Sequence, residues 1–305
     1  MTFRQVRCTI TGANGFIGLA LVPHLSALGY SVEKWPRNDT FDLANNVAAP
    51  NKWITQLSGI DTVVHLAGLA HQSRTSKNDS HFFSINRDGT LRLATAASAA
   101  GVKRFIFIST AKVFGEGGSI VYNATTIPAP ADAYAQSKWQ AEQLLIEQFS
   151  PTMELVILRP PLVYGWEAKA NFANLLKLSL LPIPLPFAGI KNRRAMIGID
   201  NLIDLIATCI TSPAAAGKTF LCADAQHYSL ADMVLAIRST IGRNPWLFQP
   251  PLPLLHGLKK LLGRATSERL LGDFQMDCTE TYKTLDWKPP FTIEQILSRG
   301  ARSTW

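Results

Sequence analysis

Cysteine and long apolar segments are scarce in this chain of 305 residues. The four cysteines lie far apart, without the spacing of a disulfide framework or a zinc site: Cys8, Cys209, Cys222 and Cys278. No uncharged apolar stretch is long enough to span a bilayer, and the first residues lack the apolar core and cleavage site of a signal peptide. We therefore expect reduced thiols, no metal ion, no integral membrane segment and a cytoplasmic protein.

Clustered positive charge is also lacking, although the formal net charge is +8. Lysines and arginines are scattered, without a long basic run or interleaved aromatic residues, so we expect no nucleic acid partner. A few phosphate-binding arginines on a solvated surface fit the charge better, which favours a small polyanionic substrate. The apolar segment 254–262 leaves two interpretations open: an amphipathic helix of a substrate lobe, or a helix lying on a membrane.

Short β-rich apolar runs alternate with helical patterns through the first half of the chain. The runs cover Val6–Thr11, Ser31–Trp35, Thr62–Leu66, Arg104–Ile108 and Glu154–Leu158. Such alternation predicts an α/β protein with a doubly wound parallel sheet of the Rossmann type. A hydrophobic content of 47% is enough for one large or two modest domains.

After Arg159 the rhythm loosens and prolines cluster, as expected for a smaller C-terminal α/β lobe that binds substrate. We predict a dinucleotide-binding domain over residues 1–165 and a substrate lobe over most of 166–305. Residues 197–222 contain a helical pattern and the strand-like Thr219–Cys222, so we expect them to return to the first domain.

A glycine-rich loop follows the first predicted strand and opens the first predicted helix. Gly12 permits the tight turn, Gly15 lets a pyrophosphate approach the backbone, and Gly18 lets the helix pack close to the strand. Such a pattern also occurs in ordinary turns, but its place within a βαβ unit favours a cofactor. The predicted cofactor contacts in this loop also include Asn14, Phe16 and Ile17.

The end of the second predicted strand indicates which nicotinamide cofactor is bound. An acidic residue there would bind the ribose of NAD, whereas this chain has Arg37, which suits the 2′-phosphate of NADP. We therefore predict NADP(H) in preference to NAD(H), with Asp42 and Leu43 near the adenine. A solvated loop arginine remains the alternative.

Tyr134 and Lys138 stand four residues apart at the start of a predicted helix, for which Asp132 is the expected N-cap. A nearby ammonium favours the phenolate, so Tyr134 is the expected proton donor or acceptor for a carbonyl or an alcohol. Ser109 and Thr110 end a predicted strand, where open α/β sheets place ligand-binding residues. Thr110 is expected to orient the substrate oxygen, and Ser109 to support the nicotinamide side.

These motifs together resemble the extended short-chain dehydrogenases, specifically the epimerase/dehydratase group that acts on nucleotide sugars. The matching pieces, in order, are Thr11-Gly-x-x-Gly-x-x-Gly18, His65-Leu-Ala-Gly68, Asn86-x-x-Gly-Thr90, Ser109-Thr-Ala-Lys-Val-Phe-Gly115, Tyr134-x-x-x-Lys138 and Arg159-Pro-Pro-Leu-Val-Tyr-Gly165. The resemblance covers nearly the whole chain. It implies a UDP-sugar substrate and a homodimer.

The resemblance also implies further contacts. Leu66, Ala67, Gly68, Asn86, Pro160 and Leu162 would line the cofactor cleft, together with Ser109, Tyr134 and Lys138. The implied substrate contacts are Thr110, Lys112, Asn171, Phe172, Phe187, Arg194 and Arg269, the two arginines of the second lobe holding the pyrophosphate.

Two departures narrow the expected reaction. Dehydratases of the group carry an Asp-Glu pair after the threonine, whereas this chain has Ala111 and Lys112, so we do not expect dehydration. The phrases around His65, Asn192 and Arg269 most resemble bacterial 4-ketoreductases that make UDP-N-acetyl-6-deoxyhexosamines for surface polysaccharide such as O-antigen. We expect NADPH-dependent reduction of a 4-keto sugar. A 4-epimerase with bound NAD and a non-catalytic dinucleotide sensor remain the alternatives.

Overall fold

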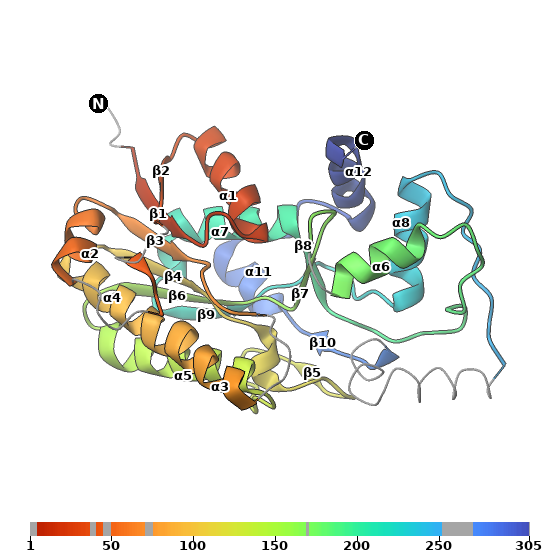
Figure 1. Ribbon diagram of the computed structural model, residues 1–305, viewed down its shortest axis with the longest axis horizontal. Helices are drawn as coiled ribbons and strands as arrows, with labels where there is room; N and C mark the ends of the chain where they lie inside the picture. Colours follow the sequence, from red (N-terminus) through yellow and green to blue (C-terminus); the bar gives the residue numbers. More distant parts are fainter. Residues whose placement is uncertain are drawn as a thin grey trace.

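The computed structural model describes residues 5–36, 41–44, 50–70, 76–168, 171–251 and 271–304. Its centre is a six-stranded parallel sheet in the order β2-β1-β3-β4-β6-β9 (Figure 1). The strands are β1 (Arg7–Thr11), β2 (Ser31–Lys34), β3 (Thr62–His65), β4 (Arg104–Ile108), β6 (Glu154–Arg159) and β9 (Lys218–Leu221). From β1 the chain adds β2 on one side and β3 on the other. This confirms the predicted doubly wound sheet and puts its switch point beside β1.

Helices cover both faces of the sheet because the strands are apolar on both sides. In β4, Ile106 and Ile108 pack into one core with α1 (Phe16–Ala27) and α7 (Ile199–Thr211). Phe105 and Phe107 face the opposite core, with α2 (Pro50–Leu57), α4 (Thr90–Ala99) and α5 (Ala133–Phe149). The alternation follows from the period of two along a strand.

All six strands of this sheet occupy runs that the sequence predicts. The return of the chain after residue 197 is also present, since β9 pairs with β6 at the edge of the sheet. A second return was not predicted: α11 (Thr279–Leu285) brings Leu285 and Trp287 into the core beside α1 and α7. The division at residue 165 itself stays a prediction.

The second lobe is built from short pieces around two small cores. β7 (Leu162–Tyr164) pairs with β8 (Met196–Gly198), and β5 (Val121–Tyr122) pairs with β10 (Gln275–Met276). Its helices are α6 (Asn171–Ser179), α8 (Leu230–Thr240) and α12 (Ile293–Thr304), seen on the right in Figure 1. Four short helices complete the described elements: α3 (Ser76–Phe82), η2 (Phe83–Gly89), η3 (Ala111–Phe114) and η4 (Pro213–Ala215).

One buried arginine organises the proline-containing loops of this lobe. Arg238 of α8 is 2% exposed and donates hydrogen bonds to the backbone carbonyls of five residues: Ser179, Leu181, Ile183, Asn244 and Trp246. The loops after α6 and after α8 have few regular partners for these carbonyls, and a buried carbonyl without a partner is costly. The guanidinium therefore replaces the backbone pairing that a sheet would provide.

All four cysteines are free thiols with buried side chains, as expected for a chain without disulfides. Burial raises the pKa of the Cys8 and Cys209 thiols to about 12, which keeps them protonated and unreactive. Among the helices of the described residues, none is both long and apolar enough to cross a membrane. Residues 254–262 lie outside the described part of the chain.

Candidate active site

Tyr134 and Thr110 meet at the carboxyl end of β4. The Asp132 side chain caps α5, accepting a hydrogen bond of 2.8 Å from the backbone N–H of Ala135, and so places Tyr134 in the first helical turn. Thr110 precedes η3 and accepts a hydrogen bond of 3.2 Å from the backbone N–H of Lys112. The Thr110 and Tyr134 side chains lie close together, and the Thr110 hydroxyl acts to lower the pKa of the phenol. The predicted pair of proton-handling hydroxyls is therefore assembled.

Lys138 lies one helical turn further along α5, in an apolar setting. Its Nζ donates a hydrogen bond of 2.8 Å to the Ile108 carbonyl and lies 4.5 Å from the centre of the Phe107 ring. Burial lowers the pKa of Lys138 to about 8, an effect that the Glu142 carboxylate opposes. A pKa of about 8 lets the Lys138 ammonium lose its proton at mildly basic pH.

Burial has the reverse effect on the phenol, because there the charged form is the deprotonated one. It raises the pKa of Tyr134 to about 12, while the hydrogen bond from Thr110 works in the opposite direction and the Asp132 charge adds to the rise. Without further positive charge, Tyr134 is a neutral proton donor. That is the state required to protonate a developing alkoxide.

The glycine loop has the close approaches that the sequence analysis assigned to it. A Cβ on Gly12, whose φ is +68°, would lie 2.8 Å from the Ala67 backbone nitrogen. A Cβ on Gly18 would lie 2.4 Å from the Gly12 carbonyl oxygen, so only glycine lets α1 pack this closely. Gly15 caps α1 without a side-chain hydrogen bond, and no acidic residue stands in the first turn. The N–H groups of this turn suit an anion such as a pyrophosphate.

A buried polar chain joins the glycine loop to the next strand. The Thr11 hydroxyl lies 2.6 Å from Nδ1 of His65, and Nε2 of His65 lies 2.9 Å from the Thr90 hydroxyl. Thr90 donates its proton to the Asn86 carbonyl and Thr11 accepts from the Ala67 N–H, so His65 donates from Nε2 and accepts at Nδ1. Burial lowers the pKa of His65, in agreement with this neutral form.

Asn86 holds the loop after β3 beside α5. Its side-chain amide exchanges two hydrogen bonds with the Leu69 backbone, of 2.8 and 3.0 Å, and donates a third to the Ser137 hydroxyl. A Cβ on the exposed Gly68 would lie 2.9 Å from Asn86 Oδ1 and 3.3 Å from Lys138 Nζ. The predicted cofactor contacts Gly68, Asn86 and Lys138 thus gather at one point.

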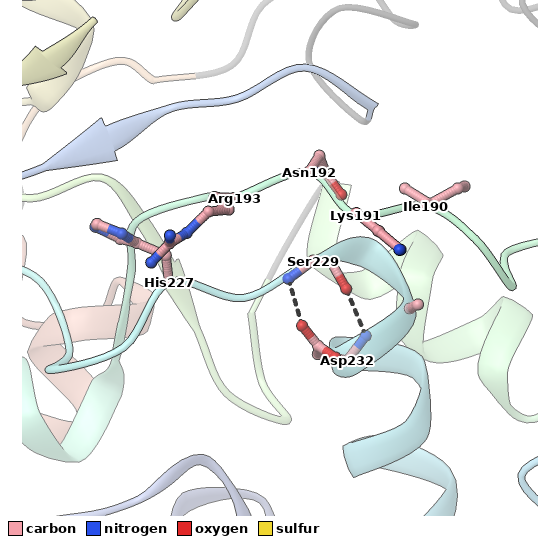
Figure 2. Close-up of a pocket in the computed structure, with 8 residues that line it drawn as sticks. Ile190, Lys191, Asn192, Arg193, His227, Ser229 and Asp232 are labelled. Atoms are coloured by element: carbon pink, nitrogen blue, oxygen red, sulfur yellow. Dashed lines mark hydrogen bonds between the residues drawn. The ribbon is translucent and has the colours of Figure 1, made fainter. Parts of the chain in front are cut away.

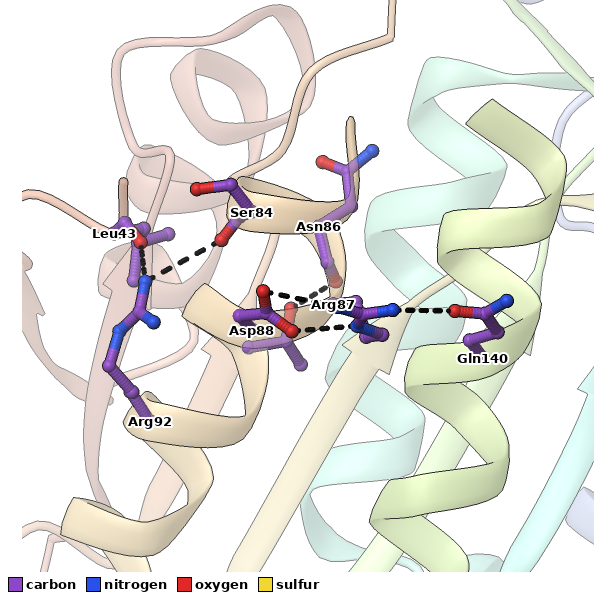
Figure 3. Close-up of polar contacts among 8 residues, drawn as sticks. Leu43, Ser84, Asn86, Arg87, Asp88, Arg92 and Gln140 are labelled. Atoms are coloured by element: carbon purple, nitrogen blue, oxygen red, sulfur yellow. Dashed lines mark hydrogen bonds and ion pairs between the residues drawn. The ribbon is translucent and has the colours of Figure 1, made fainter. Parts of the chain in front are cut away.

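A π-helix, η2 (Phe83–Gly89), carries Asn86 and is tied to two neighbours (Figure 3). Arg87 pairs with Asp88 at 2.6 Å and donates a hydrogen bond of 2.9 Å to Gln140 on α5. Arg92 on α4 donates a hydrogen bond of 3.5 Å to the Ser84 carbonyl of η2 and another to the Leu43 carbonyl. Wide helical turns of this kind are uncommon and often occur at functional sites, and here the wide turn carries Asn86 toward Lys138.

Several predicted contacts are buried or bound within the protein in this structure. Phe172, 1% exposed, and Phe187, 8% exposed, are core residues of the second lobe. Ser109 directs its hydroxyl to Glu142. Leu43 is buried against Gly89, and the Asp42 carboxylate accepts a hydrogen bond from the Ala44 backbone. The side chains of Phe172, Phe187 and Ser109 therefore do not present themselves to a ligand, and contact by their backbones stays a prediction.

Other predicted residues are distributed between the surface and the apolar cores. Leu162 is 40% exposed whereas Pro160 is buried, and Leu66 and Ile17 pack against the core beside α7. Phe16 packs against the core of the second lobe, so the start of α1 contacts both parts of the molecule.

Two predicted substrate contacts are already paired. Nζ of Lys112 lies 2.7 Å from Asp132 and 3.3 Å from Glu116. Arg194 donates a hydrogen bond of 2.8 Å to the Gly272 carbonyl, and burial lowers its pKa. Both cationic side chains bind other groups of the protein in this structure. Their contact with substrate stays a prediction.

A depression of about 380 Å³ opens in the second lobe beside the run Asn192–Arg194 (Figure 2). Its cationic lining comes from Lys191 and Arg193, which are exposed, rather than from Arg194. Asp232 and Ser229 close its floor through a capping box at the start of α8. Sequence reasoning missed Arg193, because adjacent arginines differ only in which one the backbone turns outward. Arg37, Arg269 and the Asn171 side chain lie outside the described residues.

Comparison with known proteins agrees with this geometry. A model of the NAD dependent epimerase/dehydratase family matches residues 8–223. The chain belongs to that family. It is 36% identical to a UDP-glucose 4-epimerase of Vibrio cholerae over 96% of this chain and 94% of the relative.

More distant similarities point the same way. One is to an N-acetyl-alpha-D-glucosaminyl-diphospho-ditrans,octacis-undecaprenol 4-epimerase of Escherichia coli O157:H7, 25% identical over 95% of this chain and 92% of the relative. Among solved structures, RMD from Pseudomonas aeruginosa complexed with NADPH superposes with a TM-score of 0.76 at 21% identity, covering 96% of this chain and 97% of that one. This family member is an NAD(P)-dependent nucleotide-sugar enzyme of the short-chain dehydrogenase type.

Proposed function

We propose that this enzyme reduces the C4 ketone of a UDP-4-keto-6-deoxy-N-acetylhexosamine with NADPH. The observation that supports the proposal most directly is the placement of Thr110 beside Tyr134, with Lys138 one turn further along α5. These groups suit the interconversion of a ketone and an alcohol. Lys112 stands where dehydratases have the acidic pair that removes water, which argues against dehydration.

The glycine cradle fits a dinucleotide. Side chains at Gly12 and Gly18 would collide with backbone atoms, so the turn is as compact as a pyrophosphate site requires. The first turn of α1 would hold the phosphates, and Gly68, Asn86 and Lys138 would line the path to the nicotinamide. Bound NADPH supplies a hydride.

The chain's own groups carry the rest of the reaction. Thr110 and Tyr134 hydrogen-bond the substrate oxygen as negative charge develops on it, and Tyr134 donates the proton. Lys138 stabilises the phenolate left behind, because its ammonium lies on the same face of α5. Arg194 and Arg269 are proposed to hold the UDP pyrophosphate, while Lys191 and Arg193 line the depression beside them.

A 4-epimerase that retains NAD is the second candidate, favoured by the 36% identity to the Vibrio cholerae UDP-glucose 4-epimerase. The same catalytic groups serve both reactions, since an epimerase oxidises and then reduces the same carbon. The two differ in cofactor use. A reductase exchanges its cofactor in every cycle, and an epimerase does not.

Nuclear magnetic resonance of the product made with NADPH deuterated at the transferring position separates the two candidates. We expect deuterium at C4 of a 6-deoxy-N-acetylhexosamine, with one NADPH consumed per sugar. Interconversion of UDP-glucose and UDP-galactose without net NADPH use would refute the reductase and support the epimerase. A family member that only senses dinucleotide would give neither result.

The preference for NADPH is proposed from Arg37 alone and is tested separately. We expect NADPH to bind more tightly than NADH, and Arg37→Ala to narrow the difference by about tenfold, as loss of one charge-assisted contact implies. Fluorescence titration of both cofactors measures it. Equal affinities in the unsubstituted protein would contradict the assignment. A homodimer and a role in surface polysaccharide synthesis remain further proposals.

A further inference from the structure

A buried charge cluster that the proposed reaction does not use lies directly behind the active site. Glu142 is fully buried and stands one helical turn after Lys138 on α5. Its carboxylate receives the Arg159 guanidinium through contacts of 2.6 and 3.1 Å to one oxygen and 3.2 Å to the other. The Ser109 hydroxyl donates to the same carboxylate. Among the described residues, the side-chain hydrogen bonds of Glu142 are thus made to the ends of two strands.

A gain in stability does not account for this buried ion pair. Removing two charges from water is expensive, and replacing a buried ion pair with apolar residues of similar volume is often neutral or stabilising. The surroundings here would accept apolar side chains, since the Arg159 guanidinium lies 5.1 Å from the Phe114 ring centre and 5.3 Å from that of Trp139. A function for the charges is therefore worth seeking.

The cluster connects the three elements that carry the catalytic groups. Ser109 precedes Thr110 at the end of β4, Arg159 precedes Pro160 at the end of β6, and Glu142 shares α5 with Tyr134 and Lys138. A shift of α5 along the sheet would separate the Tyr134 and Thr110 hydroxyls, and it would have to break the contacts of Glu142 first.

We propose that Glu142 is a positioning residue of the active site: bound to Arg159 and Ser109, it fixes α5 against the strand ends and supplies the counter-charge of the Lys138 ammonium. The proposal rests on the proposed function only in placing Lys138 beside the cofactor. It does not depend on which sugar is used.

Other charged groups near the catalytic helix do not supply this counter-charge. On η2, Arg87 pairs with Asp88. On η3, Lys112 is bound by Asp132 and Glu116. His65 on β3 is neutral. Glu142 is the acidic group that raises the pKa of Lys138 against its burial, while Arg159 on β6 neutralises the excess charge of the carboxylate.

The variant Glu142→Gln tests the electrostatic part, since an amide of nearly the same shape can accept from Arg159 through its oxygen and donate to the Ser109 hydroxyl through its NH2 group. Lys138 should then lose its proton at lower pH. We expect the basic limb of the pH dependence of NADPH affinity, measured by fluorescence, to move down by about one pH unit, which near pH 8 is up to a tenfold loss of affinity. The same shift should appear in kcat with any sugar that is turned over. Lys138→Met, which should abolish this limb, identifies its origin.

The double variant Glu142→Leu with Arg159→Met separates positioning from stability. With two apolar residues of similar volume in their place, the protein should fold and should unfold near the wild-type temperature. Its kcat should nevertheless stay at least tenfold below that of the wild type, and the basic limb of its pH dependence should stay at the lower pH. Glu154→Gln is the matched control. Glu154 pairs with Arg104 at 2.6 Å across the same two strands, but at their opposite ends, and its loss should leave the pH dependence unchanged.

Three outcomes would overturn the proposal: a double variant with wild-type kcat and pH profile, a Glu142→Gln variant whose limb does not move, or a limb that survives Lys138→Met. Failure of the proposed sugar to react is a different result. It would refute the proposed function while the cofactor titrations still decide the role of Glu142.

Discussion

Around the six-stranded sheet, several buried polar side chains at the strand ends bind one another, as Thr11 binds His65 and Glu142 binds Arg159. In the second lobe, the most deeply buried arginine, Arg238, binds five backbone carbonyls and no side chain that the structure describes. Parallel strands satisfy their own backbone, which leaves side chains available for chemistry. Irregular, proline-rich loops leave carbonyls to be satisfied, and polar side chains are consumed in doing so.

The comparison predicts that removing a polar group at the strand ends costs rate and not stability. Tyr134→Phe should lower kcat by roughly 10²–10⁴-fold, the scale of a lost general acid, with the unfolding temperature nearly unchanged. Steady-state kinetics and thermal unfolding measure the two effects. Substantial turnover by a folded Tyr134→Phe protein would remove the assignment.

Tyr164→Phe is the matched control for that loss of one hydroxyl. The Tyr164 hydroxyl donates a hydrogen bond of 2.6 Å to Asp224, which also accepts from the Asn201 side chain, so its removal leaves a buried carboxylate less well satisfied. We expect lower stability and little change in kcat. A Tyr164 variant as slow as the Tyr134 variant would break the distinction between the two regions.

Removal of Arg238 should lower stability and leave kcat nearly unchanged. Arg238→Met removes the guanidinium from five backbone carbonyls, of which Trp246 keeps the Leu185 N–H as a second donor, and should lower the free energy of unfolding by roughly 2–4 kcal/mol, the range of large single-residue effects. Urea unfolding measures the loss. The exposed neighbour Arg243→Met is the control and should change stability little. If both variants are equally stable, the loops do not depend on the guanidinium.

The smallest effects are expected at Asp132, which caps α5 and also contributes to the raised pKa of Tyr134. Asp132→Ala removes the N-cap of α5 and should cost about 1 kcal/mol, whereas Asp132→Asn should retain the cap. Both remove the charge that adds to the raised pKa of Tyr134, so the phenol should ionise at lower pH in both variants. Urea unfolding and ultraviolet titration of tyrosine, with Tyr134→Phe as reference, test the two parts. A Tyr134 titration that the two variants leave unmoved would show that Asp132 acts only as a cap.

Prediction from the sequence succeeded where a local pattern has one physical solution. The continuous apolar, β-rich run Arg104–Ile108 predicted a strand buried on both faces, and the start of α5 followed from Asp132 as its cap. It was less successful where a residue has two possible partners of similar quality. Nothing local tells whether Ser109 faces a cofactor or Glu142, or whether Arg193 or Arg194 is turned outward, because both depend on long-range packing. The π-helix at Phe83–Gly89 has no local signal in this sequence at all.

The way the chain crosses between its two parts determines how much of it has to exist before any of it is stable. A ribosome that has released only residues 1–165 has made five strands of the sheet, but neither β9, which covers the edge of β6, nor α7, which covers one face. An open edge and a bare apolar face are hazards for a nascent chain. Leu285 and Trp287 complete that same core only when synthesis is almost finished. The part of the chain after residue 165 therefore cannot be exchanged as an independent unit. Its β9, α7, Leu285 and Trp287 complete the sheet that binds the cofactor.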